Sequence, residues 1–154
     1  METRLREALA RIAPLDEAAQ TAARARQDRL TKPQGSLGRL EALSVQLAGI
    51  SGRMPPSAQH RVIYTLAGDH GVCAQGVSAF PSEVTPQMVL NFLAGGAAIN
   101  VLARQAGAQV VVVDAGVAGD LPPADGLVIA KIARGTADMT QGPAMSREQA
   151  LAAL

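Results

Sequence analysis

The stretch Arg61-Val-Ile-Tyr-Thr-Leu-Ala67, followed at once by Gly68-Asp-His-Gly-Val72, decides the fold of this 154-residue chain. A short run that is apolar, rich in β-branched residues and ended by a glycine is typical of a buried strand in a parallel sheet. A second run, Gln109-Val-Val-Val-Val-Asp114, lies downstream, and residues 83–93 and 97–106 between the two runs have helical patterns. Strand, helices and strand in this order predict a βαβ unit.

Residues 126–132 predict a third strand, so the carboxyl-terminal part of the chain is expected to be an α/β fold. Residues 5–12 and 15–29 predict two helices before it, and Pro14 separates them. Ser36 is the expected N-cap of a third helix, which ends near Gly49 and carries an apolar face of four leucines, Leu37, Leu40, Leu43 and Leu47.

A Pro-rich connection after Gly52 marks the expected domain boundary. It separates a helical subdomain, residues 1–52, from the start of a parallel α/β domain, residues 58–154. Ser146 and Gln149 form a capping box, which predicts a helix from Arg147 onward. An apolar helix after only three strands makes a poor complete α/β domain, so the pattern predicts a truncated one.

The composition is that of a globular protein, with 48% hydrophobic and 18% charged residues. The net charge of +1 comes from interleaved acids and bases, which makes nucleic acid an unexpected partner. Cys73 is the single cysteine, so no intramolecular disulfide is possible. The amino terminus lacks the apolar core of a signal peptide, and no window approaches the roughly 20 apolar residues of a membrane span. We therefore expect a cytoplasmic protein without membrane contact.

Gly68-Asp-His-Gly-Val72 directly follows the first strand. In open α/β sheets ligands bind beyond the carboxyl ends of the strands, so a site is expected here. Asp69 could orient His70 or a ligand, and the glycines allow close backbone approach. Two alternatives stay open: both side chains could shape the turn, or they could begin a metal site, although two adjacent ligands without a third are weak evidence for a metal.

The segment from Gly76 to Phe92 gathers most of the scarce aromatic and soft apolar side chains of the chain, Phe80, Met88 and Phe92. Such surface suits a flat, apolar ring, and polar partners for it are available at Ser78, Gln87 and Asn91. The alternative is that Met88 and Phe92, four residues apart, pack into the core.

Three weaker signals follow. Gly95-Gly96 precedes a helix and could hold an anion through free amides, although a C-cap and tight joint is the commoner use of such a pair. Asp114-Ala-Gly116 ends the second strand at the ligand edge. Arg134-Gly-Thr136 could contact a phosphate or form an exposed turn.

In order along the chain, these segments resemble one enzyme family. The motifs include Gly68-Asp-His-Gly-Val72, Gly76-Val-Ser-Ala-Phe-Pro-Ser-Glu-Val-Thr85, Gly95-Gly-Ala-Ala-Ile-Asn100, Val113-Asp-Ala-Gly-Val117, and Leu30-Thr-Lys-Pro-Gln-Gly-Ser-Leu-Gly38 near the amino terminus. The set is similar to the amino-terminal portion of the nicotinate-nucleotide–dimethylbenzimidazole phosphoribosyltransferases. The resemblance runs from about Gln27 to Leu154 and covers less than half of a typical member.

The resemblance implies a Rossmann-like, three-layer parallel sheet with a helical subdomain, and a homodimer. It implies small-molecule substrates and no cofactor or metal: phosphoribosyl passes from nicotinate mononucleotide to 5,6-dimethylbenzimidazole, giving α-ribazole 5′-phosphate and nicotinate. The family's catalytic carboxylate, a Glu near the carboxyl end, falls beyond Leu154, so no catalytic residue is assigned and the chain alone is expected to be inactive.

The family segment that matches Ser78 to Asn91 lines the pocket of the aromatic base. The expected substrate-binding residues are therefore Asp69, His70, Ser78, Phe80, Gln87, Met88 and Asn91, with Asp69 and His70 shaping the edge of the site. Some members have polar side chains where this sequence has Phe80 and Met88. A base-binding module without catalysis and a subunit of a split enzyme remain the alternative functions.

Overall fold

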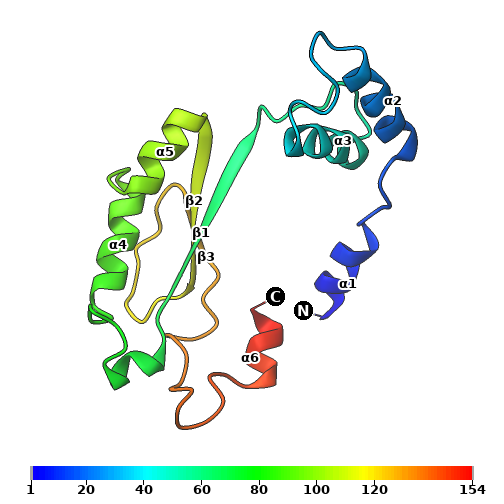
Figure 1. The fold of residues 1–154 in the computed structure, drawn as a ribbon. Helices are drawn as coiled ribbons and strands as arrows, with labels where there is room; N and C mark the ends of the chain where they lie inside the picture. The colour runs from blue at the N-terminus through cyan, green and yellow to red at the C-terminus, as the bar shows by residue number, and fades with distance from the viewer. Residues whose placement is uncertain (1, 154) are drawn as a thin grey trace. The chain divides into compact units, whose positions relative to one another are not determined.

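The computed structural model describes residues 2–153. In chain order its elements are α1 (Glu2–Ala10), α2 (Glu17–Asp28), α3 (Arg39–Ser51), β1 (Arg61–Gly68), the 3-10 helix η1 (Gly71–Gln75), α4 (Val84–Leu93), α5 (Ala98–Ala106), β2 (Ala108–Gly116), β3 (Leu127–Ile129) and α6 (Arg147–Ala152) (Figure 1). The chain divides into two compact units, residues 4–59 and residues 60–154 with the first three, and each is described by itself.

The second unit is built on a parallel sheet with the strand order β1-β2-β3. β1 pairs with β2 from Arg61 opposite Ala108 to Gly68 opposite Gly116. The predicted α/β class is thereby confirmed, and so are the first two strands. β3 has three residues, Leu127–Ile129, instead of the seven predicted for 126–132, and Lys131 beyond its end pairs with the buried Asp114.

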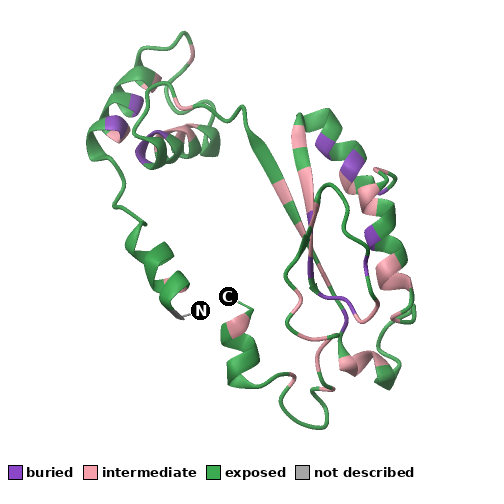
Figure 2. Cartoon of the chain, turned by 180° about the vertical axis from the view of Figure 1, so that it is seen from behind, coloured by how far each residue is buried: buried purple, intermediate pink, exposed green. Residues whose placement is uncertain are grey.

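Helices α4 and α5 both lie on one side of the sheet (Figure 1). The core there contains Val89, Val112, Val117 and Leu121. The opposite face of β1 is open within the described residues: Val62, Tyr64 and Leu66 are 45%, 64% and 69% exposed, and Figure 2 shows most of β1 as exposed or intermediate. Parallel sheets are normally covered on both faces, so one face of this sheet lacks its usual covering layer within the described residues.

The stretch Val84–Ala106 corrects the expectation that no segment approaches a membrane span. Its 23 residues are long and apolar enough to cross a membrane by length and composition. The structure divides the stretch into α4 and α5 at the glycine joint, and buried residues such as Val89 and Ala103 lie on these two helices. The apolar composition of this stretch is explained by its position, because α4 and α5 cover one face of the sheet.

In the first unit α2 packs against α3 through small residues, Ala19, Ala23 and Ala48. Gly49 allows this approach, because a Cβ there would lie 2.7 Å from the Gln20 side chain. The leucine face predicted for α3 is exposed within the described residues, with Leu40 at 64%. The prediction of Ser36 as N-cap is wrong: two turns at Gly35 and Gly38, both with positive φ, delay the helix to Arg39.

At the carboxyl end the predicted capping box is confirmed. The Ser146 hydroxyl accepts a hydrogen bond from the amide of Gln149 at 3.2 Å, and the Gln149 side-chain oxygen accepts from the amide of Ser146 at 2.9 Å. Helix α6 starts at Arg147 as predicted.

Candidate functional site

The carboxyl ends of β1 and β2 meet at one edge of the sheet, where the first motif lies. The amide of Asp69 donates to the carbonyl of Gly116 at 3.0 Å, and the carbonyl of Asp69 accepts from the amide of Thr136 at 3.0 Å. Gly135 has φ +82°, and a Cβ at this position would lie 3.0 Å from the carbonyl oxygen of Asp69. Three segments distant in sequence therefore converge around Asp69.

Cavities open at this edge, and two of them share the residues from Leu66 to His70. The first, named here the α4 cavity, has a volume of about 360 Å³ and lies between the end of β1, the 78–82 loop and α4. Phe80, Met88 and Phe92 supply apolar side chains to its lining, and His70 and Ser78 supply polar ones. Sites for small molecules are typically about 300–1,000 Å³, mostly apolar, with a few placed polar groups.

Five of the seven predicted site residues line the α4 cavity: Asp69, His70, Ser78, Phe80 and Met88. The structure places Gln87 and Asn91 outside its lining. Both are exposed on α4, and the side-chain oxygen of Asn91 lies against Gly96. Residues four apart share a helix face, so Gln87 and Asn91 lie together on the face next to that of Met88 and Phe92.

Several polar groups of the α4 cavity already have partners inside the protein. The Ser78 hydroxyl donates to the carbonyl of Phe80 at 2.8 Å. The two carboxylate oxygens of Asp69 accept from Thr85 and Ala118. Among residues 2–153, the His70 side chain makes no hydrogen bond or ion pair, and this residue is exposed. Its imidazole is thus available to a ligand, whereas the Asp69 carboxylate is engaged.

The second cavity, named the strand-edge cavity, has a volume of about 740 Å³. It shares Leu66 to His70 with the α4 cavity and extends past Gly116 and Thr136 to Ser146 and Gln149. Sequence reasoning placed Gly116 at the ligand edge as a weak signal, and it did not assign Met145, Ser146 or Gln149 to a site. The available signal was positional, because segments that follow the strands gather at the carboxyl edge of a parallel sheet.

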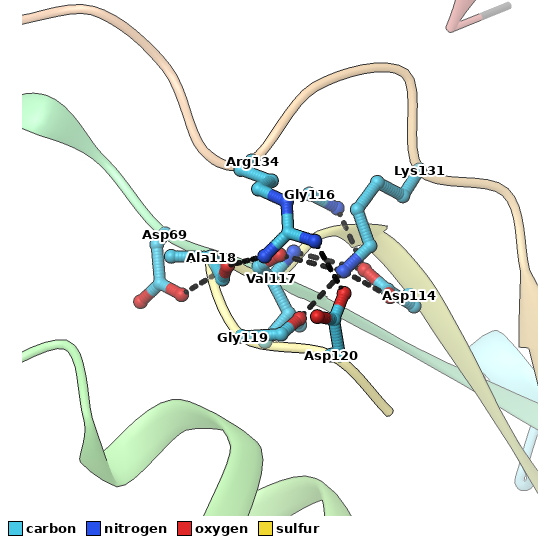
Figure 3. A network of polar contacts seen from close by, with 9 residues as sticks. All are labelled: Asp69, Asp114, Gly116, Val117, Ala118, Gly119, Asp120, Lys131 and Arg134. Carbon is cyan, nitrogen blue, oxygen red and sulfur yellow. Dashed lines mark hydrogen bonds and ion pairs between the residues drawn. The ribbon is translucent and has the colours of Figure 1, made fainter. Parts of the chain in front are cut away.

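A polar network holds the loop that follows β2 (Figure 3). The buried Asp114 accepts from the amides of Gly116 and Val117 at 3.1 and 2.8 Å and forms an ion pair with Lys131 at 3.0 Å. Lys131 also donates to the carbonyls of Val117 and Gly119 at 2.8 and 2.7 Å. Asp114 is therefore a structural group and does not face a ligand.

The two remaining motifs have structural partners as well. The amides of Gly95 and Gly96 donate to the carbonyls of Phe92 and Asn91, so this pair is a helix joint and its amides are not free for an anion. Arg134 donates to Asp120 at 2.6 Å and to the carbonyl of Ala118 at 3.2 Å. In the part of the chain that the structure describes, no three His, Cys, Asp or Glu side chains gather in a metal-binding arrangement.

Comparison with known proteins places these features in one family. A family model described as "Phosphoribosyltransferase" matches residues 12–154. The nicotinate-nucleotide–dimethylbenzimidazole phosphoribosyltransferase of Chloroflexus aurantiacus is 65% identical over 143 residues, which are 93% of this chain and 41% of that protein. The protein of the same name from Geobacter sulfurreducens is 56% identical over 152 residues, covering 99% of this chain and 43% of that protein.

The structural comparison agrees. A crystal structure of the enzyme of this name from Thermus thermophilus superposes with a TM-score of 0.84 at 49% identity, and the match covers 90% of this chain and 42% of that one. The chain thus spans about two fifths of the length of these relatives. From the family match, the sequence identity and the shared fold, we conclude that the chain belongs to the nicotinate-nucleotide–dimethylbenzimidazole phosphoribosyltransferase family.

Proposed function

We propose that this chain carries the part of a phosphoribosyltransferase site that binds the aromatic base 5,6-dimethylbenzimidazole. In the proposed reaction of the whole enzyme, the phosphoribosyl group of nicotinate mononucleotide passes to this base, giving α-ribazole 5′-phosphate and nicotinate. The α4 cavity carries the proposal, because Phe80, Met88 and Phe92 offer apolar surface for a flat ring and His70 offers a free polar group. Asp69 and Ser78 line the same cavity, and Gln87 and Asn91, on the neighbouring face of α4, complete the proposed set at its edge.

The proposed reaction has two requirements: the aromatic ring has to be held in position, and its proton has to be removed. One ring nitrogen attacks C1′ while nicotinate leaves, and a base accepts the proton of the other nitrogen. The α4 cavity would orient the ring for this attack, which is a large part of the catalytic effect in a two-substrate transfer. The carboxylate of Asp69 lines both the α4 cavity and the strand-edge cavity, and each of its oxygens already accepts a hydrogen bond within the protein.

We therefore propose that the proton-accepting carboxylate lies outside these 154 residues and that the chain alone does not turn over. The strand-edge cavity adjoins the α4 cavity along Leu66 to His70 and is the proposed place of the second substrate. We further propose that the whole enzyme is a homodimer, which sedimentation of the full-length protein would test. We also propose that it is cytoplasmic, which fractionation of the cells would test.

Cys73 provides a direct test of base binding. It is the single cysteine of the sequence, it is half-buried, and it lines the α4 cavity. Bound 5,6-dimethylbenzimidazole should slow alkylation of its thiol by iodoacetamide in a saturable way, whereas ribose 5-phosphate, which has no aromatic ring, should not. An alkylation rate unchanged at the solubility limit of the base would contradict the proposal.

Two neighbouring residues of α4 supply a matched pair of variants. Met88 lines the cavity and is 40% exposed, whereas Leu90 is 49% exposed and lies outside the lining. Met88→Gln should weaken protection of Cys73 by the base, and Leu90→Gln should leave it unchanged. Equal effects of the two variants would show that the ring binds elsewhere.

A subunit of a split enzyme is the alternative function, and complementation tests it. A polypeptide with the rest of the Chloroflexus relative's sequence should then restore formation of α-ribazole 5′-phosphate when added to this chain. Base binding without turnover in either condition would favour a base-binding module, and turnover by the chain alone would overturn the proposed division of the site.

A further inference from the structure

We infer that Asp69 is a positioning residue, whose carboxylate joins helix α4 to the loop 116–120 and so sets the shape of the α4 cavity. The inference depends on the proposed function only for the identity of the ligand. The joint itself is visible in the hydrogen bonds of Asp69 and can be tested without any ligand.

The carboxylate lies between two segments that have no other side-chain hydrogen bond to each other among the described residues. Its Oδ1 accepts from the Thr85 hydroxyl, in the first turn of α4, at 2.6 Å. Its Oδ2 accepts from the amide of Ala118 at 2.7 Å. The residue is 8% exposed, so both bonds are shielded from water. Short bonds to a buried carboxylate are among the stronger hydrogen bonds in proteins.

The rest of the loop is held from the side of the sheet (Figure 3). Asp114 binds the amides of Gly116 and Val117, and Lys131 binds the carbonyls of Val117 and Gly119. Only the Ala118 amide is held by a carboxylate that also contacts α4. Asp69 therefore connects this hydrogen-bonded loop to the first turn of the helix.

This connection bears directly on the cavity, because Asp69, Thr85 and Met88 line it together. A change in the distance between the first turn of α4 and the end of β1 would alter the gap that a flat ring has to fill. Each oxygen of Asp69 already accepts one hydrogen bond, and these two bonds hold the carboxylate between Thr85 and Ala118. The geometry thus favours an indirect role, through the position of α4.

The conservative variant separates this role from one that needs a charged carboxylate. In Asp69→Asn the amide oxygen can accept from Ala118 while the amide nitrogen donates to Thr85, so the joint survives. Asp69→Ala removes both bonds. Asp120→Ala is the matched control, since it removes a carboxylate of the same loop whose side chain is 80% exposed.

The first measurement is the Kd of 5,6-dimethylbenzimidazole, by fluorescence titration of the whole chain. We expect Asp69→Ala to weaken binding about tenfold or more, as the loss of charge-assisted hydrogen bonds implies. Asp69→Asn should stay within about threefold of the unmodified chain, and Asp120→Ala should not differ from it. An Asn variant as defective as the Ala variant would overturn the positioning role.

The second measurement is hydrogen exchange of the Ala118 amide by NMR, with no ligand present. Protection should be kept in Asp69→Asn and lost in Asp69→Ala, while amides of the sheet such as Val112 remain protected in both. Unchanged protection in the Ala variant would overturn the inference even if the chain binds no base. Absence of base binding with the expected exchange pattern would instead refute the proposed function and leave the joint established.

Discussion

Gly71 and Gly142 differ in how much space surrounds them. A Cβ at Gly71 would lie 2.5 Å from the backbone of Ala137 and Asp138, whereas nothing lies within 4 Å of a Cβ at Gly142. Neither residue has a positive φ, so the comparison concerns space alone. The close approach at Gly71 brings η1 against the segment after β3, at the edge where the cavities open.

We predict that Gly71→Ala destabilises the chain and that Gly142→Ala does not. The added methyl group has to displace backbone, and overpacking of this kind costs about 1–3 kcal/mol. Urea unfolding monitored by circular dichroism measures the difference. Similar unfolding free energies for the two variants would mean that the 71–75 segment moves away at little cost.

Lys131 and Arg134 allow a second comparison of single residues. Lys131 pairs with an Asp114 side chain that is 0% exposed, whereas the Arg134–Asp120 pair is 62% and 80% exposed. Lys131→Met should cost about 3–5 kcal/mol, because it leaves a buried carboxylate without its cation. Arg134→Met should cost about 0–1 kcal/mol. The same urea titration would contradict this reasoning if both substitutions had equal cost.

At the scale of the element, the start of α3 shows how local signals compete. Glu41 accepts from Lys32 at 2.7 Å and from the amide of Leu37 at 3.2 Å, and it thereby ties the two glycine turns to the helix. Ser36 has the right residue type for an N-cap, but the turns at Gly35 and Gly38 place it before the helix. The carboxylate of Glu41, and not the hydroxyl of Ser36, accepts the hydrogen bond from the amide of Leu37 before the helix.

The hydrogen bond from Lys32, followed by that from Leu37, holds the pKa of Glu41 below its ordinary value of 4.5. Because the folded pKa is lowered, the stability that Glu41 contributes is present above 4.5 and is lost as the pH falls through the lowered pKa. We predict that Lys32→Met raises the pKa of Glu41 toward 4.5, as measured by NMR titration of its carboxyl carbon. Arg39→Met should shift it less, since it breaks neither bond.

At the scale of the whole molecule, the most prominent feature of residues 60–153 is that one face of the sheet leaves its apolar side chains exposed. Val62, Tyr64 and Leu66 are exposed side by side on β1, and Val128 on β3 is 48% exposed on the same face. Contiguous apolar surface of this kind is a site of association or aggregation.

The predicted division into domains 1–52 and 58–154 stays a prediction, which expression of each part would test.

We predict that the purified chain associates in a concentration-dependent way and that Tyr64→Lys combined with Leu66→Lys reduces the association. Leu9→Lys combined with Ile12→Lys is the control, because these residues are 57% and 73% exposed outside the sheet. Sedimentation velocity over a range of concentrations measures the effect. Equal association of both double variants would mean that the open face is not responsible.

The sequence by itself determined the kinds of elements and most of their positions. The runs at Arg61 and Gln109 became parallel strands, and Ser146 with Gln149 started α6, because strand patterns and capping boxes act over a few neighbouring residues. Within α4, periodicity also separates Met88 and Phe92 from Gln87 and Asn91. It predicts two faces, but only packing against β1 decides which face lines the cavity.

Only the tertiary structure decided which polar groups are free to act. Asp69 looked available for a ligand, yet its partners Thr85 and Ala118 lie 16 and 49 residues away. Asp114 stood at the ligand edge, yet Lys131, which follows β3 in the chain, forms an ion pair with it. Hydrogen bonds between distant segments leave no local pattern in a sequence, because they form only when the strands bring the loops together.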